Sequence, residues 1–250
     1  MRPRLGLLSA AGLVAAALAA SAAAVEHMRA EAALDGDTLA LEGGAVLRLA
    51  GIRAPKGEAE ARFAEAARAK LAALAAGQAL TLQIAGPARD RHGRIPAQAV
   101  RWDGVWLQGA MLEAGLARVE TFADNPARAA EMLALEAAAR QARRGLWGDR
   151  RYRVLTPEEA ERVGDGFQLV EGRVQRVTER RGRFYLDFGA DWRRDFTVAI
   201  ALGDRARFRA AGLDPAGLEG ATLRVRGWMR RLNGPMIEAT HPEQIERLAP

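Results

Sequence analysis

The chain has 250 residues, with 49% hydrophobic and 27% charged side chains. This balance excludes disordered, collagen-like and miniprotein classes and predicts two globular domains. The chain contains no cysteine, which excludes disulfides, thiol catalysis and thiolate metal sites. The formal net charge is +6 and falls to +4 without Arg2 and Arg4 of the N-terminal segment, so charge alone does not identify a nucleic-acid-binding protein.

The N-terminus has the pattern of a bacterial secretory signal. Arg2 and Arg4 precede an apolar run over residues 5–20, and small residues follow at 20–23. As a helix this run would span about 24 Å, which is short of the roughly 30 Å hydrocarbon core of a bilayer. We therefore expect residues 1–23 to be a cleaved signal peptide rather than a retained membrane anchor. The mature protein is then periplasmic or secreted and is not inserted in a membrane.

Residues 24–148 are predicted to form the first domain. Its expected helices are 58–76, with one apolar stripe, then 107–114, and a third opened by Asn125 as N-cap and Pro126 at the first helical position. Three strands, a helix and two strands are the order of a five-stranded Greek-key OB barrel, here with two extra helices. The expected strands cover residues 28–34, 37–42, 45–52, 79–85 and 95–102.

A polar linker over residues 149–166 is predicted next, where Thr156, Pro157 and Glu159 indicate a capping box on a short helix. Residues 167–250 are predicted to form the second domain, which repeats the β-β-β-α-β-β order and resembles OB-type nucleic-acid-binding domains. The predicted fold class is mainly β with α, as two OB-type barrels. The expected strands of the second barrel cover residues 167–178, 182–189, 195–202, 220–229 and 235–240.

Three motifs of the first domain occur in a fixed order. They are Asp35-Gly36-Asp37-Thr38 followed by the stretch 47–55, then the stretch 90–94 (DRHGR), then 144–147 (RGLW). Together, on these elements, they resemble the thermonuclease (staphylococcal-nuclease-like) family over roughly residues 28–148. The resemblance implies an OB barrel with three helices and calcium-dependent hydrolysis of phosphodiesters in DNA or RNA.

Hydrolysis of a phosphodiester requires charge neutralisation, a metal ion or an equivalent clamp, and a base that activates water. The resemblance implies that Arg48 and Arg94 clamp the phosphate, and a guanidinium presents paired donors to phosphate oxygens at any working pH. Asp37 matches the family's first Ca²⁺ ligand, since a carboxylate is the hard oxygen donor that Ca²⁺ prefers. His92 is expected to be packed or solvated rather than catalytic.

Other positions depart from the family pattern. The second calcium-ligating Asp of the family falls at Arg53, and its Glu base falls at Lys56. A guanidinium within about 4 Å of a divalent cation would cost roughly 8 kcal/mol at an effective dielectric of 20, and a charged ammonium accepts no proton. Arg53 and Lys56 would then form an anion-binding pocket with Arg48 and Arg94, or would pair with surface carboxylates.

Three hypotheses on function follow. The leading one is an exported protein that binds nucleic acid while standard Ca²⁺-dependent hydrolysis is impaired. The alternative is an active nuclease that uses Arg48 and Arg94 with a base relocated to Glu58 or Glu60. The third is a periplasmic scaffold that binds protein or an envelope polymer through the same barrels.

The second domain offers candidate nucleic-acid contacts but no acid–base constellation. Aromatic side chains interleaved with arginines are typical of OB faces that stack bases and track phosphates. Alternatively, the tryptophans close the barrel ends and the arginines pair with nearby carboxylates. The candidates are Tyr185, Trp192, Trp228, Arg193 and Arg226.

Overall fold

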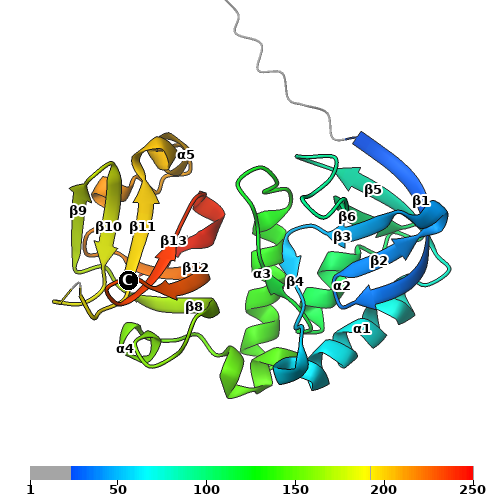
Figure 1. Ribbon diagram of the computed structural model, residues 1–250, viewed down its shortest axis with the longest axis horizontal. Coiled ribbons are helices and arrows are strands. Elements are labelled where there is room, and N and C mark those ends of the chain that lie inside the picture. The colour runs from blue at the N-terminus through cyan, green and yellow to red at the C-terminus, as the bar shows by residue number, and fades with distance from the viewer. Residues whose placement is uncertain (1–23, 192, 250) are drawn as a thin grey trace, which may run out of the picture.

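The computed structural model describes residues 24–191 and 193–249, shown in Figure 1. The expected signal peptide, residues 1–23, and the candidate Trp192 lie outside the described residues. Within the described ranges, no helix has both the length and the apolar character needed to cross a bilayer.

The first barrel closes in the order β1-β2-β3-β6-β5. The third and fifth strands, β3 and β6, run parallel, and the other neighbouring strands are antiparallel. Leucines that alternate along the strands fill its interior, as the period of two requires. The predicted OB order is therefore confirmed. The strands are β1 (Ala24–Asp35), β2 (Thr38–Leu41), β3 (Val46–Leu49), β5 (Ala79–Ile84) and β6 (Ile95–Arg101).

Three helices pack on this barrel: α1 (Ala61–Ala75), α2 (Leu107–Glu113) and α3 (Ala129–Gln141). Helix α1 buries a stripe that includes Phe63, Ala67 and Leu71, as expected from their spacing. The prediction for the start of α3 is wrong. The helix begins at Ala129, after Arg128 in a left-handed conformation, while Asn125 forms a bridge with Phe122.

The predicted strand 45–52 is divided in two by a turn at Ala50 and Gly51. Gly51 has a φ of 81°, and a Cβ there would lie 2.4 Å from the terminal methyl group of Met132. Only glycine therefore suits this turn. It allows the short strand β4 (Ile52–Arg53) to leave the barrel and pair with β7 (Arg118–Val119).

The connector contains α4 (Pro157–Ala160) with the predicted capping box, in which Thr156 and Glu159 exchange side-chain-to-backbone hydrogen bonds. The second sheet pairs in the order β9-β10-β11-β13-β12, and both β8 and β14 pair with β12. Its one parallel pair among the described strands, as in the first barrel, joins β11 to β13. Only residues 174–175 separate β8 from β9, so this sheet returns on itself with the connectivity of the first barrel. Its elements are β8 (Gly166–Arg173), β9 (Arg176–Arg180), β10 (Arg183–Asp187), β11 (Thr197–Ala201), α5 (Arg205–Ala210), β12 (Thr222–Arg231), β13 (Pro235–Glu238) and β14 (Ile245–Arg247).

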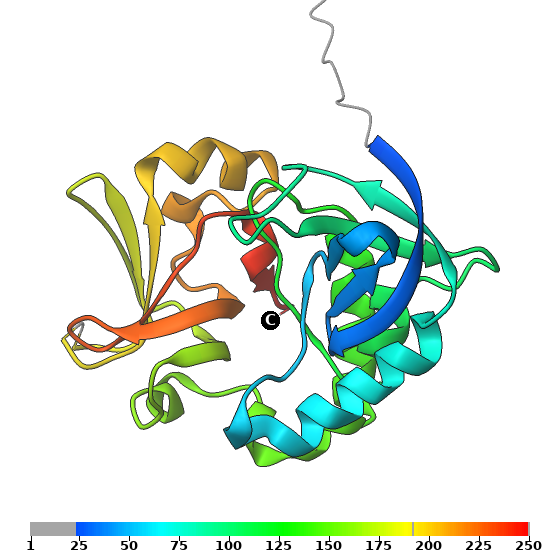
Figure 2. The same cartoon turned by 45° about the vertical axis from the view of Figure 1, so that its right-hand side comes forward.

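The two barrels lie side by side in both views (Figures 1 and 2), and Figure 1 shows α3 on the side of the first barrel that faces the second. Arg226 of β12 is 1% exposed, and its guanidinium lies 2.7 Å from Glu136 of α3 and 2.6 Å from Glu246. Glu136 also accepts a hydrogen bond from the backbone N–H of Val119. The prediction that Arg226 contacts nucleic acid is therefore wrong, because the first domain covers this side chain.

Two further hydrogen bonds join the barrels. Arg118 donates to the carbonyl of Phe167 at 2.9 Å, and Thr121 Oγ1 lies 2.8 Å from His241 Nε2. Burial of His241, reinforced by the nearby Arg207 guanidinium, lowers its pKa to about 4 from the ordinary value of 6.5. The junction therefore favours a neutral imidazole.

The ion pair between Arg226 and Glu136 supports one test. Glu136→Gln should lower the free energy of unfolding by about 2–3 kcal/mol, since it leaves a buried guanidinium with Glu246 as its remaining close carboxylate. Urea unfolding measures this loss. The matched control is Glu131→Gln on the same helix, where the exposed pair with Arg128 should contribute less than about 1 kcal/mol. Equal losses in the two variants would contradict the buried role of Glu136.

His241 predicts a pH dependence of stability. Its folded-state pKa is depressed, so its contribution is complete above pH 6.5 and is lost as the pH falls toward about 4, because only the unfolded chain binds the proton in that window. The loss should reach about 3 kcal/mol and be absent in His241→Gln. Thermal unfolding at several pH values measures it. His27→Gln, at an exposed position of β1, should retain the wild-type pH dependence.

Candidate functional site

The site lies where the β1–β2 turn meets the segment after β4. Asp37 follows the turn residue Gly36, where a Cβ would lie 2.6 Å from that of Ala54, so glycine allows the two segments to approach. The side chain of Asp37 is fully buried. Its Oδ2 accepts a hydrogen bond from Ala54 N at 2.8 Å and lies 3.3 Å from Arg48 Nη2, and its Oδ1 accepts one from Thr38 Oγ1.

Lys56 provides the remaining contacts of this carboxylate. Its Nζ lies 2.8 Å from Asp37 Oδ1 and 2.7 Å from Asp35 Oδ2. Burial opposes ionisation of Asp35, but hydrogen bonds from Lys56 and from the backbone N–H of Asp37 lower its pKa below the ordinary value. The ammonium group is thus the cation held between the two carboxylates.

Arg48 and Arg53 meet a carboxylate that the sequence analysis did not single out. Glu120, directly after β7, has its Oε2 4.0 Å from Arg48 Nη2 and 3.7 Å from Arg53 Nη1. Its Oε1 accepts a hydrogen bond from Trp228 Nε1 of the second barrel at 2.9 Å, and the Arg53 guanidinium lies 4.5 Å above the Trp228 ring. No local motif marks Glu120, and only the pairing of β4 with β7 places it beside Arg53.

Arg94 is held by its own turn. Asp90 accepts hydrogen bonds from the Arg94 guanidinium at 2.7 Å and from the backbone N–H groups of His92 and Arg94. These hydrogen bonds lower the pKa of Asp90, although burial opposes its ionisation. A cavity of about 440 Å³ brings Arg94 and Arg48 together beside this turn. Its lining also includes Arg89, Arg91, His92, Phe122, Asp124 and Asn125.

A comparison with known protein families identifies the part of the chain that contains these residues. Residues 46–149 match the model of the family described as staphylococcal nuclease homologue. Residues 46–149 therefore form a staphylococcal-nuclease-like domain. No curated protein matches the chain.

The staphylococcal nuclease family generally depends on Ca²⁺. The residues around Asp37 in this chain do not fit that ion. The donor set near Asp37 holds one further carboxylate, Asp35, and the Lys56 ammonium lies within 2.8 Å of both. The described residues contain no cluster of three or more acidic, histidine or cysteine side chains able to hold a metal. Ca²⁺ takes six to eight oxygen ligands and would be repelled by the ammonium.

The four cationic side chains expected to converge are divided. Arg48 and Arg94 line the cavity of the nuclease domain, whereas Lys56 and Arg53 are absent from its lining. Arg53 turns toward Glu120 and Trp228. The predicted four-cation pocket is therefore wrong, because nearby carboxylates attract two of its members.

The two candidate bases, Glu58 and Glu60, do not line the cavity that Arg48 and Arg94 share. Glu60 accepts hydrogen bonds from the backbone N–H of Lys56 at 3.0 Å and from the hydroxyl group of Tyr152 at 2.7 Å. Burial and this carboxylate raise the pKa of Tyr152. Glu58 is exposed in a short 3-10 turn, and neither glutamate is among the residues that line the cavity.

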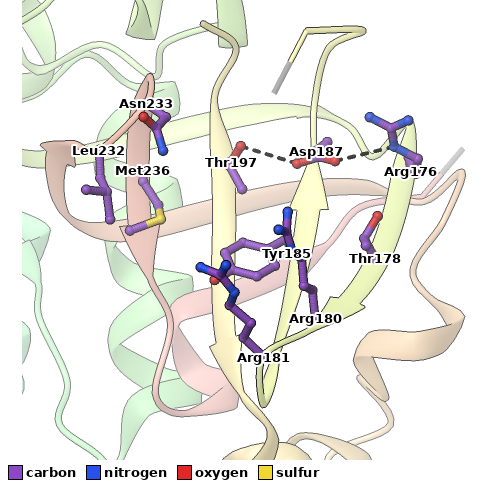
Figure 3. A pocket seen from close by; sticks show the side chains of 10 residues that line it. All are labelled: Arg176, Thr178, Arg180, Arg181, Tyr185, Asp187, Thr197, Leu232, Asn233 and Met236. Carbon is purple, nitrogen blue, oxygen red and sulfur yellow. Dashed lines mark hydrogen bonds and ion pairs between the residues drawn. The ribbon is translucent and has the colours of Figure 1, made fainter. Parts of the chain in front are cut away.

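The candidates of the second barrel are distributed over different places. Tyr185 lines a cavity of about 460 Å³ with Arg176, Arg180 and Arg181, and Figure 3 shows Asp187 at its wall between Arg176 and Thr197. Trp228 is instead at the junction of the barrels. In the loop after β10, the backbone N–H of Arg193 donates to Asp191 at 3.1 Å.

Lys56→Met tests the compensating role of the ammonium. The variant should lose about 1–3 kcal/mol of unfolding free energy at neutral pH, because Asp35 and Asp37 remain close together without this cation. The loss should shrink below about pH 4, since the lowered pKa of Asp35 means that its contribution is present above the unfolded value of 3.8 and disappears as the pH falls through the folded one. Chemical unfolding near pH 7 and near pH 3 measures both effects.

The control for this test is Lys70→Met on α1, the only other lysine of the chain. It should change the unfolding free energy by less than about 0.5 kcal/mol, as is usual for surface substitutions. A loss in Lys56→Met that did not depend on pH would contradict the pairing with Asp35.

Proposed function

We propose that this protein is exported and binds nucleic acid through the phosphate backbone at the arginine-lined cavity, without Ca²⁺-dependent phosphodiester hydrolysis. The observation that carries the proposal is the Lys56 ammonium between Asp35 and Asp37, at 2.7 and 2.8 Å. It provides from within the chain the positive charge that a metal ion would provide. The fold of the nuclease domain is retained while the metal position is filled.

Retained binding is supported by the lining of the cavity. Arg48, Arg89, Arg91 and Arg94 face it together with the acidic Asp90 and Asp124, which leaves an excess of positive charge for a phosphate. Guanidinium groups match phosphate oxygens as paired donors. Asn125 lines the same cavity, and neither of its side-chain amide atoms has a hydrogen-bond partner among the described residues.

Loss of standard hydrolysis is supported by the chemistry of the substituted positions. A protonated lysine does not accept the proton of an attacking water, and loss of a positioned base costs on the order of 10²–10⁴ in rate. Arg53 replaces a family calcium ligand and is engaged by Glu120 at 3.7 Å. The carboxylate of Glu60 is occupied by Lys56 N and Tyr152, so it is not oriented as a replacement base.

Export is supported by the sequence of the first 23 residues, which has a basic start, an apolar run and small residues at its end. The partner of this cavity is then nucleic acid, DNA or RNA, that is present in the periplasm or outside the cell.

Fluorescence anisotropy with labelled single-stranded DNA and RNA tests the binding. Affinity should fall steeply between about 50 and 200 mM salt, because phosphate contacts release counterions. Arg91→Ala and Arg94→Ala should each weaken binding and reduce the salt dependence by about one phosphate contact. The control is Arg68→Ala on α1, where the exposed side chain pairs with Glu65 away from the cavity. Absence of salt-dependent binding to every oligonucleotide would contradict the proposal and favour a scaffold.

A cleavage assay with the same oligonucleotides, in Ca²⁺ and in chelator, tests the second half of the proposal. No metal-dependent product is expected. Ca²⁺-dependent cleavage that is lost in Arg48→Ala would contradict it and show an active nuclease.

A further inference from the structure

Two aromatic side chains are exposed at the junction of the barrels. Phe122, on the segment between β7 and α3, is 55% exposed, and Trp228 of β12 is 54% exposed. A second cavity, of about 430 Å³, lies at this junction and is lined by both. Large apolar side chains left open beside a charged cavity indicate a ligand surface rather than a core.

The two cavities are neighbours, because Phe122 lines the arginine-lined cavity and the junction cavity alike. A row of contacts also joins them. Glu120 lies 4.0 Å from Arg48 on one side, and on the other it accepts the hydrogen bond of Trp228 and lies beside Arg53. A ligand longer than one phosphate group would therefore extend from the arginines toward Trp228.

The two cavities differ in chemistry in the way that a nucleotide does. Four arginines surround the first, which suits the phosphate. The junction cavity balances Arg226 and Arg230 against Glu120, Asp165 and Glu238 and adds the aromatic rings, which suits an uncharged base with polar edges. Arg53 at 4.5 Å from the Trp228 centroid holds that ring in place.

We propose that the junction of the two barrels is a base-stacking site and that the protein selects single-stranded nucleic acid. The phosphate backbone lies in the arginine-lined cavity, and neighbouring bases stack on Phe122 and Trp228. In a duplex the bases stack on one another and their faces are closed to such platforms. This inference rests on the proposed binding function and adds a site built by both domains.

The test compares three probes of equal length: a single strand, its duplex, and a strand with abasic residues that keeps the phosphates. Phe122→Ala and Trp228→Ala should each weaken binding to the intact single strand about tenfold and leave binding to the abasic strand and the duplex within about twofold. The matched control is Trp102→Ala, a 75% exposed tryptophan in the turn after β6, which should bind all probes as wild type does.

Trp228→Phe keeps an aromatic face and loses the hydrogen bond to Glu120, so it should retain most of the affinity if stacking is the role of the side chain. Thermal unfolding of each variant shows that it is folded. Equal losses on intact and abasic strands would overturn the inference, as would no loss on either.

If Tyr185→Ala weakens binding to the intact strand and the junction variants do not, the cavity of the second barrel holds the bases and the inference is overturned. Each of these outcomes overturns the inference and leaves the proposed function standing, since salt-dependent binding and its loss in Arg94→Ala are measured separately. If the wild-type protein binds none of the three probes, the proposed function itself is overturned.

Discussion

The burial of one charged side chain, Arg226, fixes how the two domains of this protein meet. Its guanidinium lies between Glu136 of the nuclease domain and Glu246 of the second barrel, at 2.7 and 2.6 Å. Buried ion pairs add little net stability, but they strongly disfavour arrangements in which one partner is left alone. The pair therefore acts on specificity: it holds β12 against α3, and only in that arrangement does Trp228 of β12 reach Glu120 and Arg53.

Charge compensation of a second buried group shapes the site itself. Asp37 is fully buried and lies beside Asp35 across a tight turn, so the fold requires positive charge at this place. A divalent cation would satisfy that requirement, and so does the Lys56 ammonium with help from Arg48. The two solutions exclude each other in space and in sign. Under the proposed function, the acidic pair Asp35 and Asp37 belongs to the structural framework, and the neighbouring arginines bind the phosphate.

Local signals in the sequence predicted much of the fold. Alternating apolar residues and glycine turns predicted both barrels, and Thr156 with Glu159 predicted the capping box that the structure contains. The errors that concern Arg226 and the site share a physical cause, which is contact between distant segments. Side chains alternate along β12, and this alternation places Arg226 on the outer face of its own barrel. Only the docked nuclease domain buries it. Similarly, Glu120 has no motif, and its place beside Arg48 and Arg53 depends on the pairing of β4 with β7.

Under the proposed function, the same contacts imply that a single substitution would not supply the calcium-dependent chemistry of the family. Glutamate at position 56 would place a third carboxylate against Asp35 and Asp37, with the Arg48 guanidinium, 3.3 Å from Asp37, as the neighbouring cation. A Ca²⁺ ion drawn to that acidic site would still lack the carboxylate ligand that Arg53 replaces, and Arg53 is held by Glu120 and the Trp228 ring. Removing Arg53 alone would take a cation from Glu120 and from the ring while Lys56 still fills the metal position. Each reversal is unfavourable without the other, so Arg53 and Lys56 form a coupled pair that is compatible with the fold and with the proposed binding surface.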